Sequence, residues 1–409
     1  MSISYISDGG AVSVDIEIPR TIQALETMKH PVAKLECQAC GYKNYRMSAR
    51  AIGDIAIGAC PKCGGNMVVV AKELPPGLSE IEILVSEHFE VIDFYLNEGR
   101  MEFEVSSPDT KKSFAGLLVA LKPKGYMPAL RERDGDLRLL VARSPQIKKG
   151  NVLINVVLFF VTIVSTFIAG YFFIFDENFL YSGVFSATIM LVLGSHELGH
   201  KIAAWRNNVD STMPYFIPSP IGLGTFGAFI RIKSPIPTKE ALVEMGASGP
   251  ILGFLVALPI TFVGIRFSTL DPNGISLPIT PLLFGIFQLL NFGTISAALK
   301  LNPLAFAGWV VMVVTMFNLM PAGQLDGGHV ARGILSAERH HELSRALSLV
   351  LVLIGLFNSL FLVWGLFIFI LFRGYHVGAL DDVSELSRRH KLIAVMAFAI
   401  FLLCFPLPV

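Results

Sequence analysis

The sequence is poor in charge. Only 16% of its 409 residues are Asp, Glu, Lys or Arg and 53% are hydrophobic, whereas an average soluble domain is about a quarter charged. The shortage is uneven, because residues 1–149 have a soluble composition and long apolar runs fill the chain from Val152 onward. This pattern excludes a wholly soluble protein and predicts a soluble head on a membrane-embedded body.

Two further features are missing. The formal net charge is only +1, which argues against a nucleic-acid-binding protein, because such a protein needs a concentrated basic surface. The first 31 residues mix acidic and basic side chains, without a compact apolar stretch or an Arg- and Ser-rich leader. We therefore expect no nucleic-acid partner, no secretory signal and no transit peptide.

Cysteine is also scarce, yet four of the five cysteines form two C-x-x-C pairs. Each pair is followed by glycine, which suits a tight turn toward a metal. Paired C-x-x-C at this separation predicts a structural zinc ribbon in a reducing environment, and a redox role is the alternative. The predicted ligands of this structural Zn²⁺ are Cys37, Cys40, Cys60 and Cys63, while Cys404 is expected to be a small buried apolar residue.

Composition divides the chain into an N-terminal extension (1–30), the ribbon (31–74), a small α+β module (75–146) and the membrane body (147–409). Within the module, alternating apolar residues predict two β-hairpins flanking one helix. Nothing in the module has a catalytic pattern, so we expect a docking or regulatory role. The expected elements are strands 90–96 and 101–106, a helix over 108–122, and strands 127–133 and 137–143.

The membrane body contains five apolar runs long enough for a helical crossing. Basic residues flank alternate ends of these runs, and Lys148 and Lys149 precede the first, so the head is expected on the cytoplasmic side of the cell membrane. The runs cover residues 152–175, 181–204, 247–265, 304–320 and 392–407.

Two other apolar stretches do not fit a simple crossing. Residues 280–299 are interrupted by Pro, Gly and Asn, which predicts an interfacial or re-entrant segment. Residues 346–372 fit either one long tilted helix or two short helices turning at Asn358-Ser359. The expected fold is therefore a multi-span α-helical membrane protein with six or seven transmembrane helices, seven being favoured by the flanking charges.

The motif His196-Glu197-Leu198-Gly199-His200 lies near the inner end of the second run. Histidines four residues apart share one face of a helix, so both imidazoles can bind one metal ion. Glu197 is rotated by about 100° and can reach a water on the metal rather than the metal itself. Ionisable residues inside an apolar span are costly unless they bind or pair, which favours a catalytic zinc site over a structural role.

A third metal ligand must come from a different part of the chain. Asp326 follows the fourth run, where Pro321 and Gly323 end the helix, and it offers a carboxylate at the membrane depth of the two histidines. His329 is the alternative ligand. Asn318 is the candidate for binding the substrate backbone or the developing oxyanion, with a helix-ending structural role as its alternative.

Together these motifs resemble the site-2 protease family of intramembrane metalloproteases, which pair an H-E-x-x-H span with an L-D-G aspartate on another span. His196, Glu197, His200 and the segment from Asn318 to Gly327 match in order, type and spacing. The resemblance implies a zinc metalloprotease that cleaves membrane proteins within or near their transmembrane segments. It implies these substrates and the lipid bilayer as partners, and it fixes no oligomeric state.

Within that family the chain is most similar to the plant chloroplast members and their prokaryotic relatives, over residues 78–409. Segments 214–218 and 226–234 and the α+β module carry this similarity. The cysteine ribbon and the expected lack of a transit peptide depart from the plant pattern. They favour a prokaryotic cell-membrane protein, archaeal members included, and no PDZ-like insertion is present.

Two alternative functions fit the same histidines. A membrane zinc transporter would use them to line a permeation path, but it would repeat polar residues along several spans, whereas here they gather at one level. An inactive relative acting as a membrane chaperone or scaffold would not need the intact Glu197. Both alternatives are weaker than the protease hypothesis. For the protease we expect two zinc ions, one catalytic and one structural.

The stretch 212–233, after the motif, is rich in Pro, Gly and aromatic residues and ends in a β-like run, 225–232. We expect it to fold back beside the metal as a strand with a free edge that holds an unwound substrate. A plain hydrophobic hairpin plugging the interface is the alternative. The predicted substrate-binding residues are Thr225, Phe226, Gly227, Ala228 and Phe229.

Overall fold

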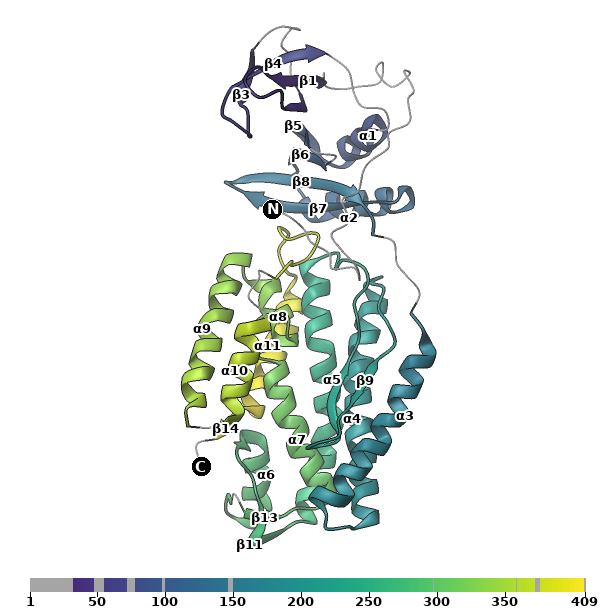
Figure 1. Cartoon of the computed structure of the whole chain (residues 1–409), viewed down its shortest axis with the longest axis vertical. Coiled ribbons are helices and arrows are strands. Elements are labelled where there is room, and N and C mark those ends of the chain that lie inside the picture. Colours follow the sequence, from purple (N-terminus) through teal and green to yellow (C-terminus); the bar gives the residue numbers. More distant parts are fainter. Residues whose placement is uncertain are drawn as a thin grey trace. The chain divides into compact units, whose positions relative to one another are not determined.

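The computed structural model describes residues 32–47, 55–71, 78–97, 100–145, 150–296, 298–357, 359–371 and 376–407 (Figure 1). The expected N-terminal extension lies outside these residues. The chain forms two compact units. The first comprises Met1–Gln146 with Leu380–Glu385, and the second comprises Ile147–Ala379 with Leu386–Val409.

The first unit is built on one eight-stranded sheet with the order β3-β4-β1-β2-β5-β6-β8-β7. The ribbon strands and the module strands are joined because β2 pairs with β5, Tyr45 lying opposite Leu96. Two modules that the sequence separates therefore share a continuous sheet. The strands are β1 (Val32–Cys37), β2 (Lys43–Met47), β3 (Ile55–Ala59), β4 (Asn66–Ala71), β5 (Glu90–Asn97), β6 (Arg100–Ser106), β7 (Tyr126–Arg133) and β8 (Asp136–Arg143).

Helices α1 (Leu78–His88) and α2 (Thr110–Leu121) contribute apolar side chains to the core of this sheet, and a 3-10 turn, Lys122–Lys124, follows α2. Asp109 starts α2 by accepting a hydrogen bond from the Lys112 N–H at 3.0 Å. The core includes Phe94, Phe103 and Phe114, each at most 1% exposed. The predicted hairpins and helix of the module are thus confirmed, with boundaries shifted by one or two residues.

A distant segment completes the first unit at strand β7. Leu130 donates its N–H to the Leu380 carbonyl at 2.8 Å and accepts from the Asp382 N–H at 3.3 Å, which makes a short parallel bridge. Leu380 is 9% exposed and packs into the same core. A peptide some 250 residues further along the chain thereby covers an edge that would otherwise be unpaired.

The second unit contains, within its described residues, three helices long and apolar enough to cross a membrane. They are α3 (Val152–Ala169, continued by a π-helical turn Gly170–Ile174), α4 (Phe179–Arg206) and α5 (Lys239–Arg266). Side chains cap them, since Asn178 accepts from the Tyr181 N–H at 3.0 Å and Thr238 accepts from the Ala241 N–H at 3.1 Å. Only 22% of the most apolar 18-residue stretch of α3 and its π-helical turn is buried, as expected for a helix that faces lipid.

The remaining helices are shorter. The expected re-entrant stretch 280–299 contains helix α6 flanked by short strands, and residues 346–372 form two helices rather than one. Gly355 packs against the Leu362 backbone and Gly365 against Val352, so these two helices run antiparallel. The elements are α6 (Leu282–Phe292), α7 (Pro303–Asn318), α8 (Asp326–Ile334), α9 (Ala337–Gly355), α10 (Ser359–Leu371), α11 (Arg388–Cys404), β11 (Thr269–Ser276), β12 (Thr280–Pro281), β13 (Ala298–Lys300) and β14 (Pro406–Leu407).

A β-hairpin between α4 and α5 reaches deep into the second unit. Its strands β9 (Tyr215–Pro218) and β10 (Thr225–Phe229) are antiparallel, and β10 is three residues shorter than expected. Ser165 donates its hydroxyl hydrogen to the Gly224 carbonyl near the hairpin tip at 2.6 Å. Ser165 lies about 20 Å along α3 from Val152 at 1.5 Å per residue, so the hairpin extends well into the span. Strand β9 packs along α3, which leaves β10 on the side of α4.

Candidate active site

Helix α4 and the start of α8 bring three candidate metal ligands together. The Nε2 atoms of His196 and His200 lie 3.0 Å apart. Asp326 Oδ2 lies 3.2 Å from the first and 3.3 Å from the second. The two histidines are at most 9% exposed. Two imidazole nitrogens and one carboxylate oxygen converging on a point form the donor set of a catalytic zinc site with one open position, so the residues fit the ion.

The hydrogen bonding of His200 fixes the nitrogen available to a metal. Its Nδ1 lies 2.7 Å from the Met245 carbonyl oxygen, which can only accept. Nδ1 must therefore carry the hydrogen, which leaves the lone pair on Nε2. A carbonyl that holds the far nitrogen of a metal-binding histidine is the usual means of orienting the ring.

Glu197 lies beside these ligands and is 3% exposed. One ligand atom from each of His196, Glu197 and His200 lies within 4.8 Å of the others. The Oε2 atom of Glu197 is buried and has no hydrogen-bond partner among the described residues. A buried carboxylate oxygen with no protein partner is costly, so this atom is positioned for a water or a substrate group.

Glycines on α5 make room for the histidines, a feature that the sequence reading missed. A Cβ on Gly249 would collide with the His200 imidazole, and one on Gly253 would lie 3.1 Å from the His196 Cβ. A Cβ on Gly246 would lie 2.6 Å from the Asp326 carbonyl oxygen. The sequence does contain an indication of this role, because these three glycines are spaced by three and four residues and therefore lie on one helix face.

The two glycines after Asp326 allow two backbone segments to pack closely. A Cβ on Gly327 would collide with the Leu319 carbonyl, and one on Gly328 would lie 2.5 Å from the Gly323 carbonyl oxygen. They allow α8 to begin directly against the turn that ends α7, rather than lining the site itself. This close packing fixes the position of the Asp326 carboxylate.

His329, the alternative metal ligand, and Asn318, the candidate for binding the substrate, lie in different surroundings. His329 Nδ1 lies 3.0 Å from the Leu325 carbonyl oxygen, and its ring packs at 4.8 Å against that of His376. Asp326, rather than His329, is the residue in contact with both motif histidines. Asn318 is the half-buried last residue of α7, and its side chain makes no hydrogen bond with any described residue.

The four ribbon cysteines form a second cluster in the first unit, with their sulfurs within 4.8 Å of one another. Cys37 and Cys63 lie 3.5 Å apart and Cys40 and Cys60 lie 3.7 Å apart, and none forms a disulfide. Glycines 41 and 64 have φ of +68° and +74° and close the two turns. Four thiols at these distances match a tetrahedral structural zinc site.

The thiols of the ribbon differ in acidity. Burial opposes ionisation of Cys37, but backbone N–H groups of Cys40 and Ala39 stabilise its thiolate and lower its pKa to about 7. For Cys40, the neighbouring thiols outweigh the Tyr42 backbone and raise the pKa to about 12.

The chain just after strand β10 reaches the Glu197 carboxylate. The backbone N–H of Ile230, the residue after β10, faces Glu197. Among the described residues β10 pairs only with β9, so its other edge is free. Gly227 has φ of +100° at a bulge, and its N–H bonds to the Thr225 hydroxyl at 3.0 Å. Phe226 and Phe229 are 69% and 46% exposed.

Residues 184–362, which contain the two histidines, Glu197, Asn318 and Asp326, match the family described as "Peptidase family M50". The chain carries an M50 peptidase domain. This is the domain of site-2 proteases, so the resemblance read from the motifs is confirmed. No solved structure matches the chain.

The relatives of the M50 domain include plant chloroplast proteins. The chain is 32% identical over 225 residues to the Arabidopsis thaliana protein "Probable zinc metalloprotease EGY1, chloroplastic" and 30% identical over 226 residues to the one named EGY2. It is 28% identical over 236 residues to "Probable zinc metallopeptidase EGY3, chloroplastic". Each match covers 53% of this chain and 40–41% of the relative, so the chain spans about two fifths of their length.

Proposed function

We propose that this chain is an intramembrane zinc metalloprotease that hydrolyses peptide bonds within or near the transmembrane segments of other membrane proteins. One observation carries the proposal. Inside the apolar second unit, Asp326 Oδ2 lies within 3.3 Å of both motif histidines, and the buried Glu197 Oε2 beside them has no hydrogen-bond partner in the part of the chain that the structure describes. The M50 domain and the names of its plant relatives support the same activity.

The chemistry follows from the roles of the three ligands and Glu197. His196, His200 and Asp326 would hold the ion, and Zn²⁺ supplies a Lewis acid that makes water nucleophilic near neutral pH. Glu197 accepts a proton from the attacking water and delivers it to the leaving amine. Asn318 is proposed to donate its amide N–H to the substrate carbonyl, because its side chain has no partner among the described residues.

A substrate helix must unwind before its backbone can enter the site, and the freed N–H and C=O groups then need partners. We propose that the free edge of β10 supplies them by strand addition. The hairpin tip at mid-span depth and the position of Ile230 beside Glu197 support this role. A passive plug would require neither the free edge nor the exposed aromatic side chains of β10.

Photo-crosslinking tests the substrate strand. Benzoylphenylalanine replaces Phe226 in a Glu197→Gln background, which retains uncut substrate, and the chain is reconstituted with a single-span membrane protein. We expect a crosslink to the substrate from position 226. The matched control is Phe267, which is 71% exposed just after the far end of α5 and should give none. Equal yields at both positions would show that β10 is only a plug.

We propose seven spans, formed by α3, α4, α5, α7, α9, α10 and α11, with the head on the cytoplasmic side of the cell membrane. The antiparallel α9–α10 pair supports two crossings there, because it returns the chain to the side it left. Helix α10 has 13 residues and covers about 20 Å, so the bilayer must thin locally around it. The free thiols of the ribbon support a reducing compartment for the head.

We propose two zinc ions per chain, a catalytic one in the second unit and a structural one at the four cysteines. The three-ligand set with an adjacent carboxylate supports the first, and the closed set of four thiols supports the second.

The function is tested by following cleavage of a single-span membrane protein reconstituted with the chain. Glu197→Gln should reduce cleavage by about 100- to 10,000-fold while zinc content stays unchanged, because only proton transfer is removed. Glu177→Gln removes an exposed carboxylate at the other end of α4 and should cleave at the wild-type rate. Cleavage by Glu197→Gln at a rate near that of wild type would refute the proposed mechanism.

A further inference from the structure

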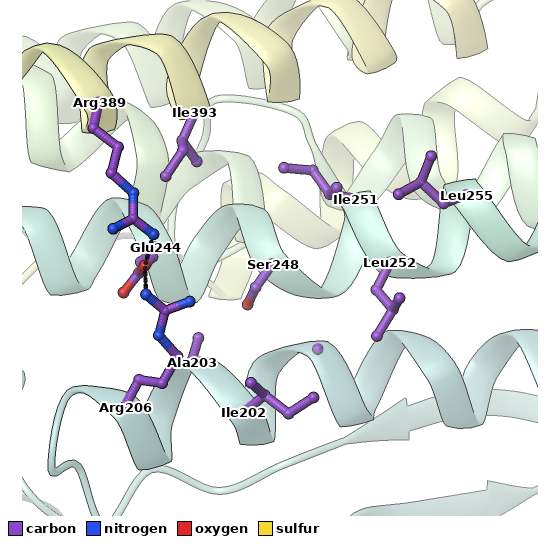
Figure 2. Close-up of a pocket in the computed structure, with 11 residues that line it drawn as sticks. Ile202, Ala203, Arg206, Glu244, Ser248, Ile251, Leu252, Leu255, Arg389 and Ile393 are labelled. Atoms are coloured by element: carbon purple, nitrogen blue, oxygen red, sulfur yellow. Dashed lines mark hydrogen bonds and ion pairs between the residues drawn. The ribbon is translucent and has the colours of Figure 1, made fainter.

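A groove with apolar walls lies between α4, α5 and α11 (Figure 2). It has a cavity of about 270 Å³, lined by Ile202, Ile251, Leu252, Leu255 and Ile393. Its floor includes Gly199 of the H-E-L-G-H motif. An occupant of this groove would therefore rest against the helix that carries the catalytic residues.

One end of the groove is charged. Figure 2 shows Arg206 and Arg389 reaching toward Glu244 from opposite helices. Their Nη2 atoms lie 3.3 and 3.4 Å from the same carboxylate oxygen, Oε1 of Glu244. The other oxygen accepts from Asn207 Nδ2 at 2.7 Å. Two guanidinium groups against one carboxylate leave one net positive charge at this end.

The two arginines keep most of their donors available. Each guanidinium has five N–H groups, and its contact with Glu244 is its only hydrogen bond or ion pair with the described residues. The side chains are 48% and 62% exposed, whereas that of Glu244 is 13% exposed. Glu244 thus holds two largely exposed guanidinium groups side by side, an arrangement that suits the binding of a phosphate group.

We propose that this groove binds one anionic glycerophospholipid. Its phosphate would lie on Arg206 and Arg389, and an acyl chain would extend past Ile251 toward Leu255. The net positive charge favours a lipid with an unbalanced phosphate over a zwitterionic one, whose own cation cancels it. A basic end joined to an apolar groove between membrane helices suits a lipid, since a free anion would gain nothing from the apolar walls.

Native mass spectrometry of the full chain tests the site. The protein is taken from micelles containing equal amounts of phosphatidylglycerol and phosphatidylcholine with identical acyl chains. We expect one phosphatidylglycerol retained per chain in preference to phosphatidylcholine. The double variant Arg206→Gln, Arg389→Gln should bind it on the order of thirtyfold more weakly. The matched control Arg388→Gln removes an exposed charge outside the groove and should bind as wild type does.

Two further experiments distinguish a bound lipid from a small bound anion. Leu255→Trp fills the apolar end and keeps both arginines, so lipid retention should fall by roughly tenfold if an acyl chain lies there. Glycerol 3-phosphate at millimolar concentration should not displace the lipid. Displacement by that small anion, unchanged retention in Leu255→Trp, or equal retention by the double arginine variant and Arg388→Gln would each overturn the proposal. None of these readouts depends on proteolysis, so failure of the proposed function would be seen separately.

Discussion

The two candidate metal sites of this chain are built in opposite ways. The ribbon places four chemically identical thiols on two tight turns of one sheet, where local chain geometry is sufficient to assemble them. The site in the membrane unit takes two candidate ligands from one helix and a third from α8, more than 120 residues later. A buried carboxylate oxygen beside them has no hydrogen-bond partner among the described residues. A closed set of four ligands stabilises a fold, and an open set of three can perform chemistry.

Removing Asp326, the proposed third ligand, should have the largest effect on zinc content and hydrolysis. Asp326→Ala should abolish the catalytic zinc and reduce hydrolysis by more than about a thousandfold, because two histidines alone bind the ion weakly. The chain should keep the ribbon zinc. Metal analysis and a cleavage assay measure both effects, and Asp210→Ala, an exposed aspartate outside the site, is the control.

If Asp326→Ala retained both zinc ions and its activity, Asp326 would not be a ligand, and His329 would become the alternative to test. The corresponding variant His329→Ala is expected to keep both zinc ions, since its ring packs against His376.

Filling the space that the α5 glycines leave for the two histidines should have a smaller effect on zinc binding. In Gly249→Ala the new methyl group meets the His200 imidazole and displaces it, so zinc affinity should fall by about 10- to 100-fold. Gly194→Ala is the matched control, because a Cβ at that position on α4 meets nothing within 4 Å. Zinc titration against a chelator measures the difference, and equal affinities in the two variants would show that α5 does not position the histidine.

The ribbon should affect hydrolysis least. Cys37→Ser should lose the structural zinc and destabilise the ribbon strands, while hydrolysis stays within about twofold of wild type. Cys404→Ala, in the last helix, should lose no zinc. A folded Cys37→Ser chain that retained its catalytic zinc yet did not hydrolyse substrate would assign the ribbon a part in catalysis.

Local patterns predicted what local geometry determines. Helical spacing placed His196 and His200 on one face, and alternation predicted both hairpins of the module. The partner of the histidines was predicted because few carboxylates lie at the right membrane depth. The Gly246–Gly249–Gly253 face was overlooked, because a glycine in an apolar helix gives no indication of what packs against it.

Non-local pairing explains the other differences. The sheet that joins the ribbon to the module depends on two pairs between β2 and β5, some 50 residues apart. The bridge between Leu130 and Asp381 links residues about 250 positions apart. Neither segment carries a motif that specifies its partner. The division of 346–372 into two helices, by contrast, was one of the two alternatives that the sequence left open, and the close approach of Gly355 to Leu362 and of Gly365 to Val352 shows which one the chain adopts.

The most direct test measures zinc per chain and hydrolysis together in wild type, Asp326→Ala and Cys37→Ser. We expect wild type to hold two zinc ions with full activity, Asp326→Ala to hold one with no activity, and Cys37→Ser to hold one with nearly full activity. Two variants with the same zinc content would then differ by more than about a thousandfold in rate, because each retains a different ion. Equal activities in the two variants would contradict the division into a structural and a catalytic site.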